Sequence, residues 1–170
     1  NVSQRKDKNI EIKQVIAQKA MELIKDGDMI FLDISTANLE LAKLLAKSLL
    51  NITVVTNMID IMLELTAATT VKLIFLGGTF SRGHDGFVGS VTISQISNYR
   101  FDLAFIGIVG IDLFDNSVAT YMVEDGLTKH AVLENSKRSY MMLETRKFNM
   151  DGTYKYAKID DFTGAIMEAV

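Results

Sequence analysis

Short apolar runs of strand length alternate along this chain with amphipathic stretches of helical period. Runs such as MIFLDI (29–34) and ITVVTN (52–57) are nearly continuously apolar, so we expect both faces of each strand to be covered. The stretches 10–25 and 39–50 instead carry apolar residues every three or four positions, which is typical of helices packed on a sheet. This alternation predicts an α/β fold with three layers, α/β/α, around a mostly parallel, Rossmann-like sheet.

The same reading gives approximate bounds for each element. Strands are expected at 29–34, 52–57, 71–78, 101–112 and 139–144, with a last strand within 154–169. Helices are expected at 10–25, 39–50, 58–68, 91–99 and 123–136. Right-handed crossovers place the carboxyl ends of such strands on one edge of the sheet, where ligands bind in open α/β folds.

Composition excludes several classes of function. The chain has no cysteine, so disulfides, thiolate zinc sites and cysteine catalysis are excluded. Its two histidines, His84 and His130, have no metal-ligand spacing, and we expect His84 to be an ordinary loop residue. A formal net charge of -3 makes the chain a poor candidate for binding DNA by itself. No apolar run reaches the roughly 20 residues that span a bilayer, and no signal-peptide segment is expected.

Polar, small or charged residues follow each of the first five predicted strands. The turn after the first strand, 33–38, reads Asp-Ile-Ser-Thr-Ala-Asn, and later strands end at Asn57, at two glycines, at GIVGID and at ETRK. Each group has a structural explanation, because the side-chain oxygens of such turns cap the following helix and glycines allow tight turns. Their recurrence on one predicted edge favours a pocket for a polar ligand.

An anion would suit this pocket, because the N-terminus of a helix presents free N–H groups and a partial positive charge. Lys147, Arg82 and Lys129 could supply full charges, while the carboxylates of Asp33 and Asp112 would suit sugar hydroxyls. A phosphorylated sugar or polyol meets both demands. The candidate ligand-binding residues are Asp33, Ser35, Thr36, Asn38, Asn57, Gly77, Gly78, Arg82, Gly107, Gly110, Asp112, Lys129 and Lys147.

An ordered set of motifs resembles the C-terminal effector-sensing domain of DeoR-type bacterial transcription regulators. The motifs are DGDMIFLDISTANLELAKLL, ITVVTNM, KLIFLGGTFSRGHDGFVGS, FDLAFIGIVGID, EDGLTKHAVLENSKR and ETRKF, and the resemblance runs from about Ile12 to the end. It implies a fold like that of sugar isomerases and CoA-transferases, related to ribose-5-phosphate isomerase and glucosamine-6-phosphate deaminase. It also implies a sensor of a phosphorylated sugar, preceded by a winged helix-turn-helix DNA-binding domain that is absent from residues 1–170.

The match to the family pattern is partial at the first turn. Where family members commonly show Asp-Ser-Gly-Thr-Thr-Thr, Asp33 and Thr36 match, whereas the residues at 34, 35, 37 and 38 differ. Thr56-Asn57, the Gly77-Gly78 pair, the Gly-x-x-Gly-Ile-Asp element at 107–112, Glu124 and Lys129 match well, and ETRK replaces the usual Asp-Ser-Ser-Lys. An altered ligand preference is therefore expected at the turn.

The resemblance implies a cytoplasmic sensor of carbohydrate metabolism that acts in a repressor, as a homo-oligomer (dimer or tetramer). We expect no catalytic residue, no metal and no cofactor, and DNA contact only through the preceding domain. Two alternatives stay open: a sugar-phosphate isomerase or deaminase on the same fold, and an oligomerisation domain with a vestigial pocket.

Overall fold

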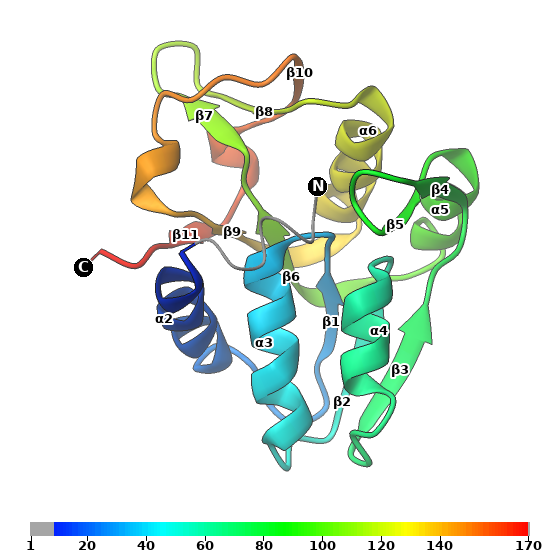
Figure 1. Ribbon diagram of the computed structural model, residues 1–170. Helices are drawn as coiled ribbons and strands as arrows, with labels where there is room; N and C mark the ends of the chain where they lie inside the picture. The colour runs from blue at the N-terminus through cyan, green and yellow to red at the C-terminus, as the bar shows by residue number, and fades with distance from the viewer. Residues whose placement is uncertain (1–8, 170) are drawn as a thin grey trace.

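A parallel six-stranded sheet forms the centre of the computed structural model, which describes residues 9–169 (Figure 1). The strand order is β11-β9-β6-β1-β2-β3, and every neighbouring pair is parallel. The strands are β1 (Met29–Leu32), β2 (Ile52–Thr56), β3 (Val71–Phe75), β6 (Phe101–Gly107), β9 (Ser136–Met142) and β11 (Gly164–Ile166). From β1, the strands β2 and β3 follow in order toward one edge of the sheet, and β6, β9 and β11 follow in order toward the other edge. The strand order therefore reverses between β1 and β6, and such a switch point opens a crevice at the carboxyl ends of the two strands.

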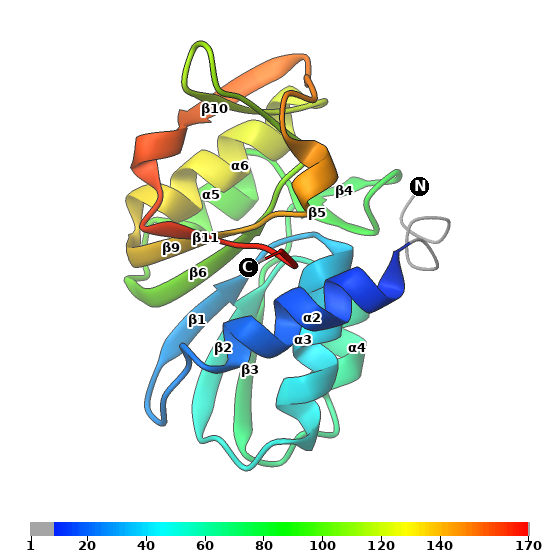
Figure 2. The same ribbon diagram turned by 90° about the vertical axis from the view of Figure 1, so that its left-hand side faces the viewer.

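Helices cover both faces of this sheet, which confirms the predicted α/β architecture. The helices α2 (Ile10–Met21), α3 (Thr36–Lys47) and α4 (Ile59–Leu65) lie on one face, while α5 (Ser90–Ile96) and α6 (Val123–Glu134) lie on the other (Figure 2). Alternate residues of β1 explain the two layers. Ile30 and Leu32 belong to the core beneath α2, α3 and α4, whereas Phe31 belongs to the core beneath α5 and α6.

The predicted single strand over 101–112 is wrong, because the chain turns after Gly107. The second half, β7 (Gly110–Asp112), pairs antiparallel with β8 (Ser117–Thr120). The strand β10 (Tyr154–Lys158) pairs with β8 in turn, which gives a separate three-stranded sheet. Ile108 and Ile111 are buried on either side of the turn, so the apolar run continues through the bend and hides it from a periodicity analysis.

Other element bounds also differ from the prediction. The predicted helix at 39–50 begins at Thr36, because the Ser35 Oγ accepts a hydrogen bond from the Asn38 N–H at 3.1 Å and caps it. The first described helix ends at Met21 rather than at 25. The remaining elements were not predicted: the hairpin of β4 (Thr79–Ser81) and β5 (Gly86–Val88), and the 3-10 turns η1 (Thr145–Lys147) and η2 (Ile159–Asp161).

Within residues 9–169, no helix combines the length and the apolar character that a membrane span requires.

Candidate functional site

A cavity of about 90 Å³ lies at the switch point of the main sheet. Its wall combines the turn after β1 and the start of α3, the ends of β6 and β9, the α6 helix and the η1 turn, with one residue each from α2 and from the β4–β5 hairpin. The lining residues are Lys13, Ile34, Ser35, Thr36, Ala37, His84, Gly107, Ile108, Val109, Asp125, Lys129, Met142, Glu144, Arg146 and Lys147.

A buried polar network around Asp33 supports this cavity from below. One carboxylate oxygen of Asp33 accepts hydrogen bonds from the Asn38 side-chain amide at 2.7 Å and from the Gly107 N–H at 3.0 Å. The other oxygen is ion-paired with the Lys129 ammonium group. Asn38 also donates to the Phe105 carbonyl at 2.8 Å. Asp33 thereby ties β1 to β6 at the point where the two halves of the sheet meet.

Lys129 remains charged although it is buried. Burial alone favours the neutral amine, but the carboxylates of Asp125, at 3.5 Å, and of Asp33 outweigh it and raise the pKa of Lys129 above its usual value. Burial raises the pKa of the Asp33 carboxyl, and the positive charge of Lys129 opposes that rise. Asp125 is held in place by the Thr120 hydroxyl, which donates to it at 2.8 Å.

The N-terminus of α3 faces the cavity. The N–H groups of the first helical turn have no partner within the helix. The Ser35 hydroxyl satisfies that of Asn38, while Thr36 and Ala37 line the cavity directly. The helix dipole adds a partial positive charge at the same point, so this wall favours an anion.

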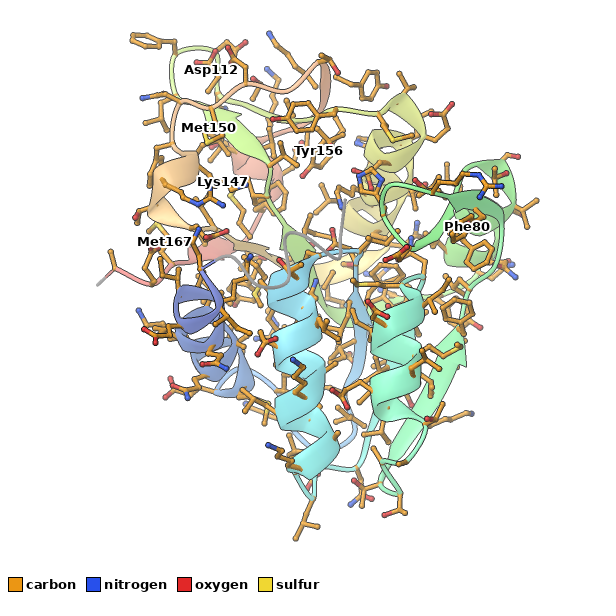
Figure 3. The ribbon with its side chains drawn as sticks, viewed as in Figure 1. Phe80, Asp112, Lys147, Met150, Tyr156 and Met167 are labelled. Carbon is orange, nitrogen blue, oxygen red and sulfur yellow. The ribbon has the colours of Figure 1, made fainter. Side chains whose placement is uncertain are left out.

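The cavity lining carries more positive than negative charge. Four cationic side chains, those of Lys13, Lys129, Arg146 and Lys147, line it together with two carboxylates, those of Asp125 and Glu144. Arg146 is paired with Glu144 at 3.2 Å. Figure 3 shows Lys147 on the η1 turn, above α2 in that view. An incoming phosphate or carboxylate would meet an excess of positive charge.

Seven of the residues proposed from the sequence lie at this site. Ser35, Thr36, Gly107, Lys129 and Lys147 line the cavity. Asp33 and Asn38 lie beneath it, 2% and 0% exposed, and act on it by positioning Lys129 and Gly107. Gly107 has no room for a side chain, because a Cβ there would lie 2.2 Å from the Cβ of Ser35.

Three more of the proposed residues hold neighbouring loops. The side-chain amide of Asn57 donates to the Phe87 carbonyl at 2.7 Å and so fixes strand β5. The Gly77 carbonyl accepts a hydrogen bond from the Thr92 hydroxyl at 2.6 Å. A Cβ at Gly78 would lie 2.0 Å from the hydroxyl oxygen of Thr92. The contacts of the two glycines with Thr92 join the end of β3 to α5. Asn57, Gly77 and Gly78 are not among the residues that line the cavity.

The last three proposed residues also lie outside the cavity lining. A Cβ at Gly110 would lie 2.0 Å from the Met150 carbonyl oxygen, so this glycine permits close backbone packing. Asp112 occupies the β7–β8 hairpin, at the top of Figure 3, where its carboxylate accepts from the Phe114 N–H at 2.8 Å. Arg82 lies in the β4–β5 hairpin, with its guanidinium 5.9 Å from the centre of the Phe80 ring.

The cavity includes residues that the candidate set omitted. These residues include Lys13, Glu144 and Arg146. The sequence predicts that the ETRK motif at 144–147 lies at this edge of the sheet, but only Lys147 of that motif is among the candidate residues. His84 is a lining residue and not merely a loop residue, and its Nδ1 lies 3.0 Å from the Ser81 hydroxyl oxygen. The glycine-rich hairpin that carries His84 gave no signal of folding back over the cavity. Among the described residues, no cluster of His, Asp or Glu is arranged to hold a metal ion.

The fold and the cavity define a class: an α/β domain with a cavity at the switch point of a parallel sheet. Solved structures share the fold at low sequence identity. Translation initiation factor eIF2B delta from Chaetomium thermophilum matches with a TM-score of 0.70 and 15% identity, over 98% of this chain and 58% of that chain. Ribose 5-phosphate isomerase A from Methanocaldococcus jannaschii matches with a TM-score of 0.60 and 15% identity, over 82% of this chain and 55% of that chain.

The chain belongs to the DeoR family, because the model of the DeoR C-terminal sensor domain matches residues 8–169. The lactose phosphotransferase system repressor of Lactococcus lactis subsp. lactis is 33% identical over 86% of this chain. The glycerol-3-phosphate regulon repressor of Escherichia coli (strain K12) is 30% identical over 91% of it. This chain covers 57% and 61% of those two proteins, respectively.

Proposed function

We propose that this chain is the effector-sensing domain of a transcriptional repressor and that it binds a phosphorylated sugar or a related metabolite in the switch-point cavity. Binding of this effector changes the affinity of the whole repressor for its operator. The affinities of the effector for the two states of the repressor must then differ, because a ligand shifts an equilibrium only by its differential affinity.

One observation carries the proposal: the first turn of α3 and four cationic side chains line one cavity. A phosphate accepts hydrogen bonds from helix N-terminal N–H groups and from lysine and arginine side chains. The hydroxyl group of Thr36, at the start of α3, and the carboxylate of Glu144, beside η1, line the same cavity and could bond sugar hydroxyls.

The relatives support the regulatory part of the proposal. The two relatives named above are repressors, and one from Bacillus subtilis (strain 168), 31% identical over 89% of this chain, is an HTH-type transcriptional repressor. We therefore assign DNA binding to a winged helix-turn-helix domain ahead of this chain. The active repressor would be a homo-oligomer, because paired half-sites on DNA require paired recognition helices.

A calorimetric and thermal-shift screen tests the proposal. The panel pairs glycerol 3-phosphate, glucose 6-phosphate, fructose 1-phosphate and ribose 5-phosphate with their unphosphorylated parents. A true effector at about 100 times its dissociation constant should add roughly 2.7 kcal/mol to the free energy of unfolding. The neutral parents should bind much more weakly, because the phosphate supplies the anchoring charge.

Two variants locate the binding site. Lys147→Ala should weaken the hit, whereas Lys47→Ala, which removes an exposed charge of α3 outside the cavity lining, should not. Equal affinities for phosphates and neutral sugars would refute the anion anchor. The absence of any shift across a broad panel would favour an oligomerisation domain with a vestigial pocket.

An isomerase or deaminase remains the enzymatic alternative, and the burial of Asp33 argues against one form of it, in which Asp33 is the general base. A general base must be within reach of the proton it removes, but the Asp33 carboxylate is 2% exposed and is bound by Lys129, Asn38 and Gly107. Turnover of a sugar phosphate by the purified chain would overturn the assignment as a sensor.

A further inference from the structure

Lys13 is the one charged member of the buried stripe of α2. The buried residues of this helix are Lys13, Ile16, Ala17 and Ala20, spaced so that they share the face that packs on α3 and the sheet. Lys13 is only 4% exposed, and it is also a lining residue of the cavity. A lysine on the inner face of a helix is uncommon, because lysine is among the residues least often buried.

A second connection joins α2 to the same site by way of the end of the chain. The Lys19 ammonium group, further along α2, donates to the carbonyls of Met167 at 2.8 Å, Glu168 at 3.4 Å and Ala169 at 3.4 Å. The Glu168 carboxylate then accepts from the Thr145 N–H at 2.8 Å and from its hydroxyl at 2.9 Å. These bonds link α2 to the η1 turn, which carries Arg146 and Lys147.

We propose that Lys13 contacts the anionic group of the effector directly and that α2 is therefore the element whose position reports whether the cavity is occupied. The proposal rests on the proposed function, since it assigns a residue and a signalling element to that effector site. Residues 166–169 would connect α2 to η1 whether or not the effector is bound. The bound anion would add a second connection between the two elements only when the cavity is occupied.

Electrostatics gives the direction of the effect. Lys13 lies on α2, Arg146 and Lys147 lie on the η1 turn, and all three line the same cavity. An anion bound in this cavity attracts the cationic side chains of both elements and so draws α2 toward η1. In the proposed repressor the DNA-binding domain precedes α2, so this movement is passed to the domain that reads the operator.

The experiment uses the chain of 170 residues with inorganic phosphate and with the strongest phosphorylated hit of the screen as probes. Lys13→Met removes the charge and keeps an unbranched apolar stem. Lys47→Met makes the same change at an exposed position of α3 and is the matched control. Lys13→Arg restores the charge and tests whether charge, rather than side-chain shape, is what matters.

Calorimetry should show that Lys13→Met weakens both probes by roughly tenfold or more, as expected for the loss of one charge-assisted hydrogen bond. Lys47→Met should bind as the wild type does, and Lys13→Arg should recover part of the loss. Hydrogen exchange distinguishes a signalling role of Lys13 from a merely structural one, because a structural role would not make exchange in α2 depend on the bound probe. Saturating probe should slow exchange across residues 10–21 in the wild type, and in Lys13→Met this protection should be lost even when the cavity is saturated.

Two results would overturn the proposal independently of the variants' stability. One is wild-type protein that binds the probe with no change of exchange in residues 10–21. The other is folded Lys13→Met, verified by circular dichroism, that binds with wild-type affinity. A wild-type chain that binds no probe at all would refute the proposed function itself, and this inference with it, so the two failures can be told apart.

Discussion

Replacement of Lys129 by methionine tests the central ion pair of the structure. The side chains of Lys129 and Asp33 are 5% and 3% exposed, and their charges compensate each other inside the protein. The methionine keeps most of the side-chain volume but leaves the Asp33 and Asp125 carboxylates buried without their shared cation. Removal of one partner of a buried pair typically costs about 3–5 kcal/mol. The total stability of a domain is only about 5–15 kcal/mol, so a large fraction should be lost.

The loss should also depend on pH. Burial already raises the pKa of Asp33 above 3.8, and Lys129 opposes this rise, so the variant should have a still higher pKa. A carboxyl whose pKa is higher in the folded than in the unfolded state binds its proton more tightly when folded. The deficit of the variant should therefore shrink as the pH falls from 7 through that raised pKa toward 3.8.

Urea unfolding at pH 7 and at pH 3.8, the usual pKa of the carboxyl, measures both effects. Lys137→Met is the control, because Lys137 is 54% exposed in its pair with Asp102 and should cost at most about 1 kcal/mol. The double variant Asp33→Asn/Lys129→Met should recover part of the loss. A deficit below about 1 kcal/mol, or one of equal size at both pH values, would refute the view that Asp33 is an ionised group dependent on Lys129.

Two further predictions concern other parts of the molecule. Ser35→Ala removes the cap that the Asn38 N–H uses, and it should cost about 1 kcal/mol in urea unfolding, whereas Ser35→Thr should retain most of the stability. Asp102 accepts from the Met29 N–H at 2.8 Å, and this bond, together with Lys137, lowers the pKa of Asp102 below 3.8. The stabilisation from Asp102 is therefore present above pH 3.8 and is lost as the pH falls through the lower folded pKa. The free energy of unfolding of Asp102→Asn should differ from that of the wild type at pH 7 but not in strong acid. An equal difference under both conditions would contradict this prediction.

The sequence predicts the main sheet well, because its strands are near-continuous apolar runs bounded by polar turns. The residues after β1 and β6 meet at the switch point as the strand-end argument requires, which brings Asp33 to Gly107. The small sheet could not be predicted in the same way. A turn within an apolar run changes the direction of the chain without changing its hydrophobicity, so the bend after Gly107 left no mark in the pattern.

The same bend moves Asp112 from the expected strand end into a hairpin. Lys13 was missed for a different reason: the pattern of an amphipathic helix assigns every lysine to the solvent face, and only the packing of α2 reveals this exception. His84 was missed because the way a hairpin folds back over the sheet depends on contacts remote in sequence.

The reversal of strand order also affects how the chain folds as it is made. Strands β1, β2 and β3 are consecutive in both sequence and space, so the first half can pair early. The other edge of β1 stays open until β6 is synthesised, and a nascent chain that ends before residue 101 would display the backbone groups of an unpaired strand. Asp33 would have no ion pair with Lys129 until that later residue has been synthesised. The first half alone should therefore aggregate, and completion of the cavity is expected to coincide with the last stage of folding.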